Sequence, residues 1–225
     1  PATSRRALAR PSAITVLARF MRKKPLGAAG GFIMLVITLT AIFANVVETH
    51  DPIATDAAQT LSRPSAEHWL GADHLGRDVY SRIVHGARVS LIVGIASTLL
   101  GSFFGGIIGL LSGYIGGKTD LITQRLLDIL QGLPLLVLAM VMSAALGASI
   151  QNVVIAISVP IIPPAARVIP GRVVSIPEMQ YVEGARGIGA THHRLMFRHI
   201  LPQSVAPYLI LATTHLGVAI IIEAS

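Results

Sequence analysis

Residues Tyr181–Gln203, YVEGARGIGATHHRLMFRHILPQ, form a basic segment with internal glycines that is flanked by long stretches without a charged side chain. The stretch before it runs from Ile129 to Ala166, and a second begins at its end and runs from His199 to Ile222. Such stretches are typical of membrane-spanning helices, which need about 20 apolar residues each. The segment is therefore predicted to be a loop at a membrane face and the part of the chain that contacts a soluble partner.

The composition indicates a polytopic membrane protein. Mean hydropathy is +0.68, with 52% hydrophobic and 13% charged residues, whereas charged residues make up about 25% of soluble domains. Uncharged runs of this length predict an all-α bundle of transmembrane helices. The absence of cysteine excludes disulfides and thiolate metal sites.

The apolar runs predict spans near residues 25–47, 90–114, 127–147, 151–169 and 204–222. The first run follows a basic tail, residues 1–24, and is too long for the core of a cleaved signal peptide, the competing interpretation. Pro134 in the third span and three prolines in the fourth predict kinks, which suit either a transport pathway or a structural role. The three prolines are Pro160, Pro163 and Pro164.

Charge asymmetry predicts the orientation. The tail 1–24 has seven basic residues and no acid, residues 48–88 have a net charge of −2, and the loop 170–203 is basic. Because cytoplasmic loops carry the excess of lysine and arginine, the tail and the 170–203 loop are predicted to be cytoplasmic and the 48–88 loop external. We expect the chain in the inner (plasma) membrane of a prokaryotic cell, and its basic pI requires no nucleic-acid partner.

Two shorter elements are predicted next to the second span. Apolar residues recur every four positions from Val79 to Leu91, which suggests an amphipathic helix at the outer interface before that span. Charged residues between Lys118 and Asp128 mark a short cytoplasmic turn after it.

Glycines recur every fourth residue along the second span and form one helix face. Without side chains, they allow a neighbouring helix to approach closely in a membrane. The glycines predicted to make this packing surface are Gly101, Gly105, Gly109, Gly113 and Gly117.

Three other patterns are not interpreted as binding sites. Gly116–Thr119, GGKT, resembles the end of a phosphate-binding loop, but Ser112 replaces the first glycine and a helix is predicted where a strand is required. The loop histidines His68, His74 and His85 do not share a helical face, and no metal site is expected there. The adjacent pair His192–His193 points in directions about 100° apart on a helix and is poorly placed to chelate a metal.

The central loop is expected to form two short helices. Ser175 and Glu178 fit a capping box, so the first helix begins near Ile176 and ends at the glycines 187 and 189. Thr191 caps the second helix, residues 192–201, which Pro202 separates from the fifth span. A positive φ is predicted at Gly189. A wholly structural loop is the alternative to a partner-binding one.

The residues Glu183, Ala185, Gly189, Leu201 and Pro202 match the spacing of the EAA motif in ABC importer permeases, although Gly184 replaces an alanine and His199 an isoleucine. The flanking sequences resemble the dipeptide and oligopeptide (DppC/OppC-type) subfamily over nearly the whole chain. That family has six spans, so a sixth is expected beyond the five predicted here.

This resemblance implies a transport subunit without catalysis or a cofactor of its own, while ATP and magnesium bind to partner subunits. The implied partners are a second permease, two cytoplasmic ABC ATPase subunits, an external solute-binding protein and membrane lipid. Di- or oligopeptides are the expected cargo, with nickel chelates, glutathione and sugars as related possibilities. The residues implied to couple to the ATPase are Glu183, Gly184, Ala185, Gly189, Ala190, Thr191, Leu195, His199, Leu201 and Pro202.

Two other functions fit the sequence less well. An ion-coupled secondary transporter usually has ionisable residues at midspan, and here only His215 and the span-end residue Glu223 come close. A membrane-embedded hydrolase needs a nucleophile, a base and an orienting group, and no such set is evident.

Overall fold

The computed structural model describes residues 19–168 and 201–224, together with residues 189, 191, 194 and 198. Over these residues the regular structure is helical, and the strand-like pairing consists of one isolated bridge between Ala72 and Asp78. The predicted all-α fold is confirmed. The chain divides into two compact units, residues 1–88 and 89–225.

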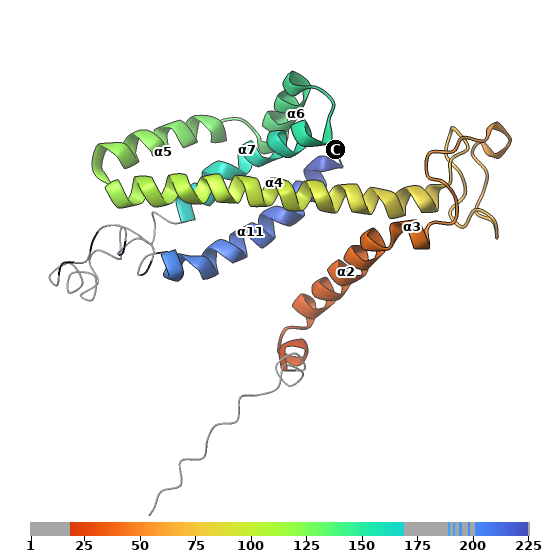
Figure 1. The fold of residues 1–225 in the computed structure, drawn as a ribbon, viewed down its shortest axis with the longest axis horizontal. Helices are drawn as coiled ribbons and strands as arrows, with labels where there is room; N and C mark the ends of the chain where they lie inside the picture. Colours follow the sequence, from red (N-terminus) through yellow and green to blue (C-terminus); the bar gives the residue numbers. More distant parts are fainter. Residues whose placement is uncertain are drawn as a thin grey trace, which may run out of the picture. The chain divides into compact units, whose positions relative to one another are not determined.

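In the first unit a helical turn at residues 19–23 precedes the apolar helix α2 (Pro25–Ile42), which is followed by the short helix α3 (Ala44–Val47) (Figure 1). Most of the apolar side chains of α2 are exposed, as expected for a helix that faces lipid. Its carboxyl end is held by Arg88, whose guanidinium donates to the carbonyls of Ala41 and Ile42 at 2.8 and 3.1 Å. This contact satisfies carbonyls that the end of a helix leaves unpaired.

The polar residues 48–78 form a compact loop with one 3₁₀ turn, η1 (Ala57–Gln59). Asp56 caps this turn by accepting from the N–H of Ala58 at 2.9 Å. Gly76 has φ +74°, and a Cβ there would lie 1.7 Å from the Asp56 carbonyl oxygen. Only glycine fits this approach of two parts of the loop.

Helix α4 (Val79–Ile115) is a single helix of 37 residues. The helix predicted over residues 79–91 is the first part of α4 and continues without a break into the predicted second span. No proline occurs between residues 79 and 115, so nothing in the backbone chemistry ends the helix at the membrane boundary.

The charged residues after α4 belong to a helix of 15 residues, α5 (Gly117–Gln131), rather than to the predicted short turn. The helix is stabilised locally, because the Gln124 amide donates to Asp120 at 3.2 Å and Arg125 pairs with Asp128 at 3.6 Å. Gly116 alone joins α4 to α5, and a helix, rather than the strand that a phosphate-binding loop requires, precedes residues 116–119.

The third apolar run is broken by Pro134. Helix α6 (Leu135–Leu146) starts directly after this proline, and α5 and α6 meet at an angle of 84°. The structure therefore differs from one helix over 127–147: α6 alone has 12 residues, about 18 Å of helix, which is shorter than the roughly 30 Å of the bilayer core.

Helices α7 (Ile150–Val168) and α11 (Leu201–Glu223) complete the second unit. Pro160, Pro163 and Pro164 lie inside α7, which continues past them. Among the described residues, four helices are long and apolar enough to cross a membrane, namely α2, α4, α7 and α11, and the bent pair α5–α6 is a fifth candidate. The core of this unit joins α4, α6, α7 and α11 through Val93, Ala139, Ile157, Ile161 and Ala219.

Candidate functional site

The predicted coupling segment is described at its hinge and at its carboxyl end. Gly189 has φ +82°, which confirms the positive φ expected there, and no atom of the described residues lies within 4 Å of its Cβ position. Thr191 is exposed. Leu201 and Pro202 form the first turn of α11, so Pro202 lies inside that helix rather than before it. The coupling residues that lie outside the described residues are Glu183, Gly184, Ala185, Ala190, Leu195 and His199.

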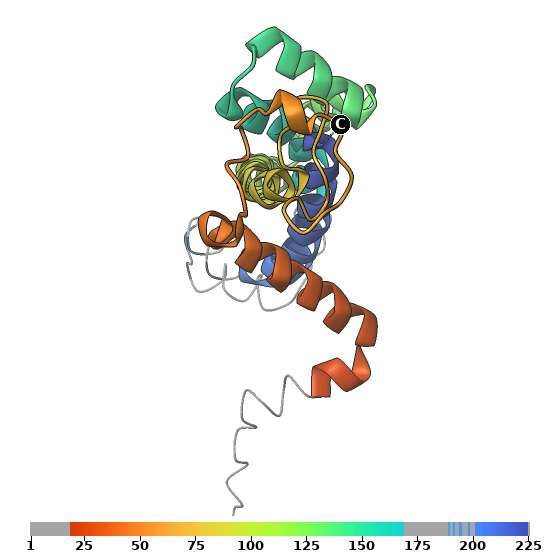
Figure 2. The same cartoon turned by 90° about the vertical axis from the view of Figure 1, so that its right-hand side faces the viewer.

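The segment connects α7 to α11, two helices that pack against each other in the second unit (Figure 2). Ile157 and Ile161 of α7 are 2% and 1% exposed, and Ala219 of α11 is fully buried in the same core. The two helices at the ends of the segment therefore share one core. Close packing of this kind transmits strain because the side chains leave little free volume.

The glycine face of α4 lies against α7. A Cβ added at Gly101 would lie 2.5 Å from the Ser158 carbonyl oxygen, and one at Gly105 would lie 2.6 Å from the Ala165 Cβ. At Gly109 the distance to the Ala166 carbonyl oxygen would be 2.1 Å. Gly117 lies outside this surface, because α4 ends at Ile115 and nothing lies within 4 Å of its Cβ position.

An ion pair and a hydrogen bond join helix α5 to the carboxyl end of α7. The guanidinium of Arg167 donates to Asp128 and to Gln131, both on α5. Next to this contact, a cavity of about 370 Å³ lies at the break between α5 and α6, with Pro134, Pro160 and Pro164 in its lining. The prolines predicted to kink the helices therefore line an open volume in the bundle.

Polar groups also connect α4 to α11. The Tyr208 hydroxyl donates to the Ser102 carbonyl, and Ser90 donates to the Glu223 carboxylate at 2.6 Å. Glu223, considered above as an ionisable residue for ion coupling, is thus held by a serine. Both ring nitrogens of His215 are buried without a hydrogen-bond partner among the described residues.

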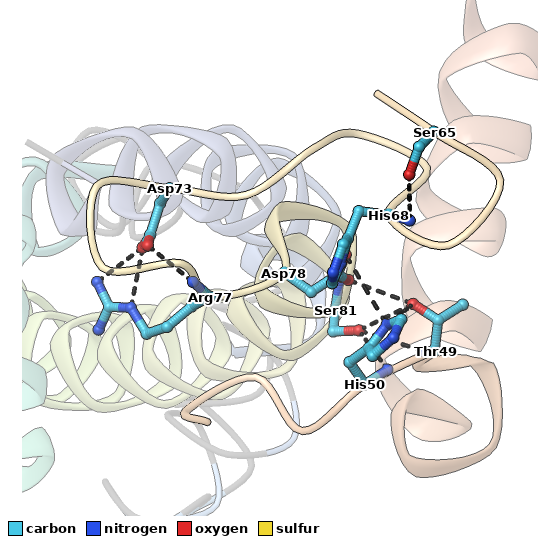
Figure 3. A network of polar contacts seen from close by, with 8 residues as sticks. All are labelled: Thr49, His50, Ser65, His68, Asp73, Arg77, Asp78 and Ser81. Atoms are coloured by element: carbon cyan, nitrogen blue, oxygen red, sulfur yellow. Dashed lines mark hydrogen bonds and ion pairs between the residues drawn. The ribbon is translucent and has the colours of Figure 1, made fainter. Parts of the chain in front are cut away.

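A second polar cluster, which the sequence did not reveal, is centred on Asp78 in the 48–88 loop (Figure 3). Its Oδ2 accepts from the backbone N–H of Ser81 at 2.8 Å and from the Thr49 hydroxyl at 3.2 Å, while its Oδ1 lies 2.9 Å from His68 Nδ1. The bond to Ser81 is the N-terminal cap of α4. We call Thr49, His50, His68, Asp78 and Ser81 the Asp78 cluster.

Asp78 is 2% exposed, and its contacts lower the pKa of its carboxyl group. Burial by itself would raise the pKa of Asp78, but donation by the Ser81 N–H, by His68 and by the neighbouring hydroxyls outweighs it and holds the pKa below its ordinary value. An aspartate directly before a helix, as Asp78 is before Val79, is a capping signal that the sequence contains. The contacts with Thr49 and His68 have no such local signal.

A further carboxylate, Asp73, fixes the turn before α4. Desolvation opposes its ionisation, but hydrogen bonds from the Arg77 side chain and from the N–H groups of Arg77 and Leu75 hold the pKa of Asp73 well below its ordinary value. Arg82 also contacts this carboxylate. The carboxylates at the start of α4 are thus structural parts of the loop.

Comparison with known proteins agrees with the family resemblance of the EAA motif. Residues 105–225, more than half of the chain, match the family described as binding-protein-dependent transport system inner membrane component. The chain is 38% identical over 201 residues to the dipeptide transport system permease protein DppC of Alkalihalophilus pseudofirmus, covering 89% of this chain and 66% of that protein.

Two other relatives are similar to the same extent. The glutathione transport system permease protein GsiD of Pectobacterium atrosepticum is 39% identical over 208 residues, or 92% of this chain and 69% of that protein. The oligopeptide transport system permease protein OppC of Bacillus subtilis is 34% identical over 203 residues, or 90% of this chain and 67% of that protein. The chain spans about two thirds of the length of these relatives. Its apolar helices and its matched residues together show that it belongs to the family of inner membrane components of binding-protein-dependent transport systems.

Proposed function

We propose that this chain is one of two permease subunits of an importer for di- or oligopeptides, and that residues 170–203 receive the movement of a cytoplasmic ATPase subunit. The names of the relatives DppC and OppC support a peptide cargo. ATP hydrolysis then takes place on the partner subunits, so in this role the chain has no catalytic site and needs no cofactor. An external solute-binding protein delivers the cargo.

The coupling role is supported by one observation above all: the segment 170–203 is the connection between α7 and α11. Helix α7 packs against the glycines of α4 through backbone atoms, and α11 contacts α4 at Gly94 and Gly106 through Ile220 and Tyr208. A force on the segment therefore acts on three helices that are in direct contact. We infer that they move together between inward-open and outward-open states.

Gly189→Leu is expected to reduce peptide uptake about tenfold while leaving an assembled complex. Leucine strains the left-handed backbone conformation at φ +82°. A tenfold loss is the size of effect expected, because the free energies that couple two sites are typically 1–3 kcal/mol. Binding-protein-stimulated ATP hydrolysis and uptake are measured on the same proteoliposomes. Gly189→Asn should retain most uptake, because asparagine tolerates this conformation.

The matched control is Gly117→Leu, since Gly117 also has a positive φ, +57°, and open space around it. Gly117→Leu should not uncouple hydrolysis from uptake. Glu183→Ala, on the same segment, provides a second test of the motif. Normal uptake by Gly189→Leu combined with Glu183→Ala would leave the segment with a structural role only.

We propose that the amino-terminal tail and the 170–203 segment are cytoplasmic and that the 48–88 loop is external. Because the chain has no cysteine, a single cysteine at Ala66, an exposed residue of the loop, should react with an impermeant maleimide in intact cells. Ser175→Cys should react only after the membrane is opened. The opposite pattern would reverse the orientation.

Glutathione is the second candidate cargo, because GsiD is as similar to this chain as DppC is. Competition by unlabelled dipeptide and by glutathione for uptake of a labelled dipeptide distinguishes the two. The external binding protein must be the native partner in both assays, since it carries much of the selectivity in the proposed mechanism.

A further inference from the structure

The Asp78 cluster brings together two imidazoles and a carboxylate from distant positions in the sequence. His68 Nδ1 lies 2.9 Å and His50 Nδ1 4.0 Å from Asp78 Oδ1. One ligand atom from each of the three residues falls within 4.8 Å of the others. The two imidazole rings stack with centroids 4.5 Å apart and an interplanar angle of 30°. Both rings therefore present a nitrogen to the same carboxylate oxygen (Figure 3).

The surroundings of these residues carry unbalanced negative charge. A cavity of about 230 Å³ is lined by His50, His68, Asp78 and three further carboxylates, and no arginine or lysine is among its lining residues. The further carboxylates are Asp51, Asp56 and Glu67. The His50 side chain is 36% exposed, so a small cation can reach the ligand atoms from solution. A site of this chemistry favours a cation over an anion or an apolar ligand.

We propose that His50, His68 and Asp78 bind a divalent transition-metal ion, with Zn²⁺ as the best-suited ion. Imidazole and carboxylate groups are its common protein ligands, at about 2.0–2.2 Å, which places ligand atoms of a tetrahedral site about 3.4 Å apart. The observed separations of 2.9 and 4.0 Å lie on either side of this value. This inference replaces the expectation from the sequence that the loop histidines bind no metal.

The cluster also contains the outer contacts that hold metal ligands in place. Asp78 Oδ2, the oxygen away from the imidazoles, accepts from Ser81 N–H and the Thr49 hydroxyl, which fixes the carboxylate plane. The Ser81 hydroxyl accepts from the N–H groups of Thr49 and His50 at 3.2 and 3.1 Å. Metal binding requires the nitrogens that face the ion to be deprotonated, so the ion would replace the hydrogen bond from His68 Nδ1 to Asp78, and each coordinating imidazole would then carry its proton on Nε2. The proposal concerns the loop alone and is independent of the cargo and of the coupling role.

The experiment measures Zn²⁺ binding by the assembled transporter in detergent, purified through a tag without histidine and stripped with a chelator. Isothermal titration and elemental analysis after gel filtration should give one tightly bound zinc per chain. His50→Asn should weaken the Kd at least about tenfold, and Thr49→Val, which removes an outer contact of Asp78, about tenfold. His50→Asn is the main variant because the His50 ring makes few contacts in the loop. It packs against His68, lies 3.2 Å from the Thr49 hydroxyl and is 4.0 Å from Asp78.

The matched control is His74→Gln, an exposed histidine of the same loop outside the cluster, which should bind zinc as the wild type does. Co²⁺ added in place of Zn²⁺ should give the visible absorption of a tetrahedral complex, and His50→Asn should lose it. Zn²⁺ should also raise the melting temperature of the wild type but not of His50→Asn. A wild type without a bound zinc, or equal losses in His50→Asn and His74→Gln, would overturn the proposal.

Discussion

Gly109→Leu is expected to prevent stable assembly of the transporter. A side chain at this position meets backbone rather than flexible atoms, since its Cβ would lie 2.1 Å from the carbonyl oxygen and 2.8 Å from the carbonyl carbon of Ala166 on α7. Overpacking costs typically 1–3 kcal/mol and occasionally more, and a clash with the backbone of α7 belongs at the upper end, about 3 kcal/mol. The yield of intact complex after mild detergent extraction, followed by size-exclusion chromatography, measures the effect.

Gly86→Leu provides the control in the same helix, because nothing lies within 4 Å of the Gly86 Cβ position. It should assemble normally, since leucine has a higher helix propensity than glycine by nearly 1 kcal/mol. Gly109→Ala should already reduce the yield, although alanine also favours the helix. If Gly109→Leu and Gly86→Leu gave equal yields, the close contact between α4 and α7 would be refuted.

Asp78→Ala is expected to loosen the 48–88 loop and the start of α4 together. The substitution removes the N-terminal cap of α4, worth about 0.5–2 kcal/mol, and leaves the buried N–H of Ser81 without its acceptor, at about 1–3 kcal/mol. The combined loss in the free energy of unfolding should be about 3 kcal/mol. Trypsin cleavage after Arg82, near the start of α4, should accelerate in the reconstituted complex, and its melting temperature should fall.

Glu67→Gln is the control, because Glu67 is exposed and next in sequence to His68, and it should behave as the wild type. The pH dependence gives an independent check. The pKa of Asp78 is lowered from its ordinary value of 3.8 in the folded protein, so its contribution is complete above that pH and is lost as the pH falls through the folded pKa. Asp78→Asn should therefore lose less stability than the wild type when the pH is lowered below about 3.8. Equal acid sensitivity of the two proteins would show that Asp78 does not stabilise the loop as an anion.

Short stretches of sequence determine several helices of this protein, one helix break and the family motif. The apolar runs predict helices at α2, α7 and α11 because burial in lipid depends on the summed hydropathy of neighbouring residues. The break at Pro134 and the positive φ of Gly189 follow from the chemistry of single residues. The motif from Glu183 to Pro202 identifies the family without any tertiary contact.

The tertiary structure decided which residues meet. The charged stretch 118–128 resembled a turn, but it is a helix joined to α7 by Arg167, 39 residues away from Asp128 in the sequence. The glycine period continued to Gly117, but only the fold shows that the packing surface includes Gly101, Gly105 and Gly109 and leaves Gly117 out.

The Asp78 cluster is the clearest case, since its two imidazoles and its carboxylate come from separate parts of the loop. Each histidine considered alone is an ordinary polar loop residue. Hydropathy and helix signals are properties of consecutive residues and can be predicted from the sequence. Hydrogen bonds, ion pairs and metal sites depend on distances between side chains that are remote in the chain, and only the folded backbone sets those distances.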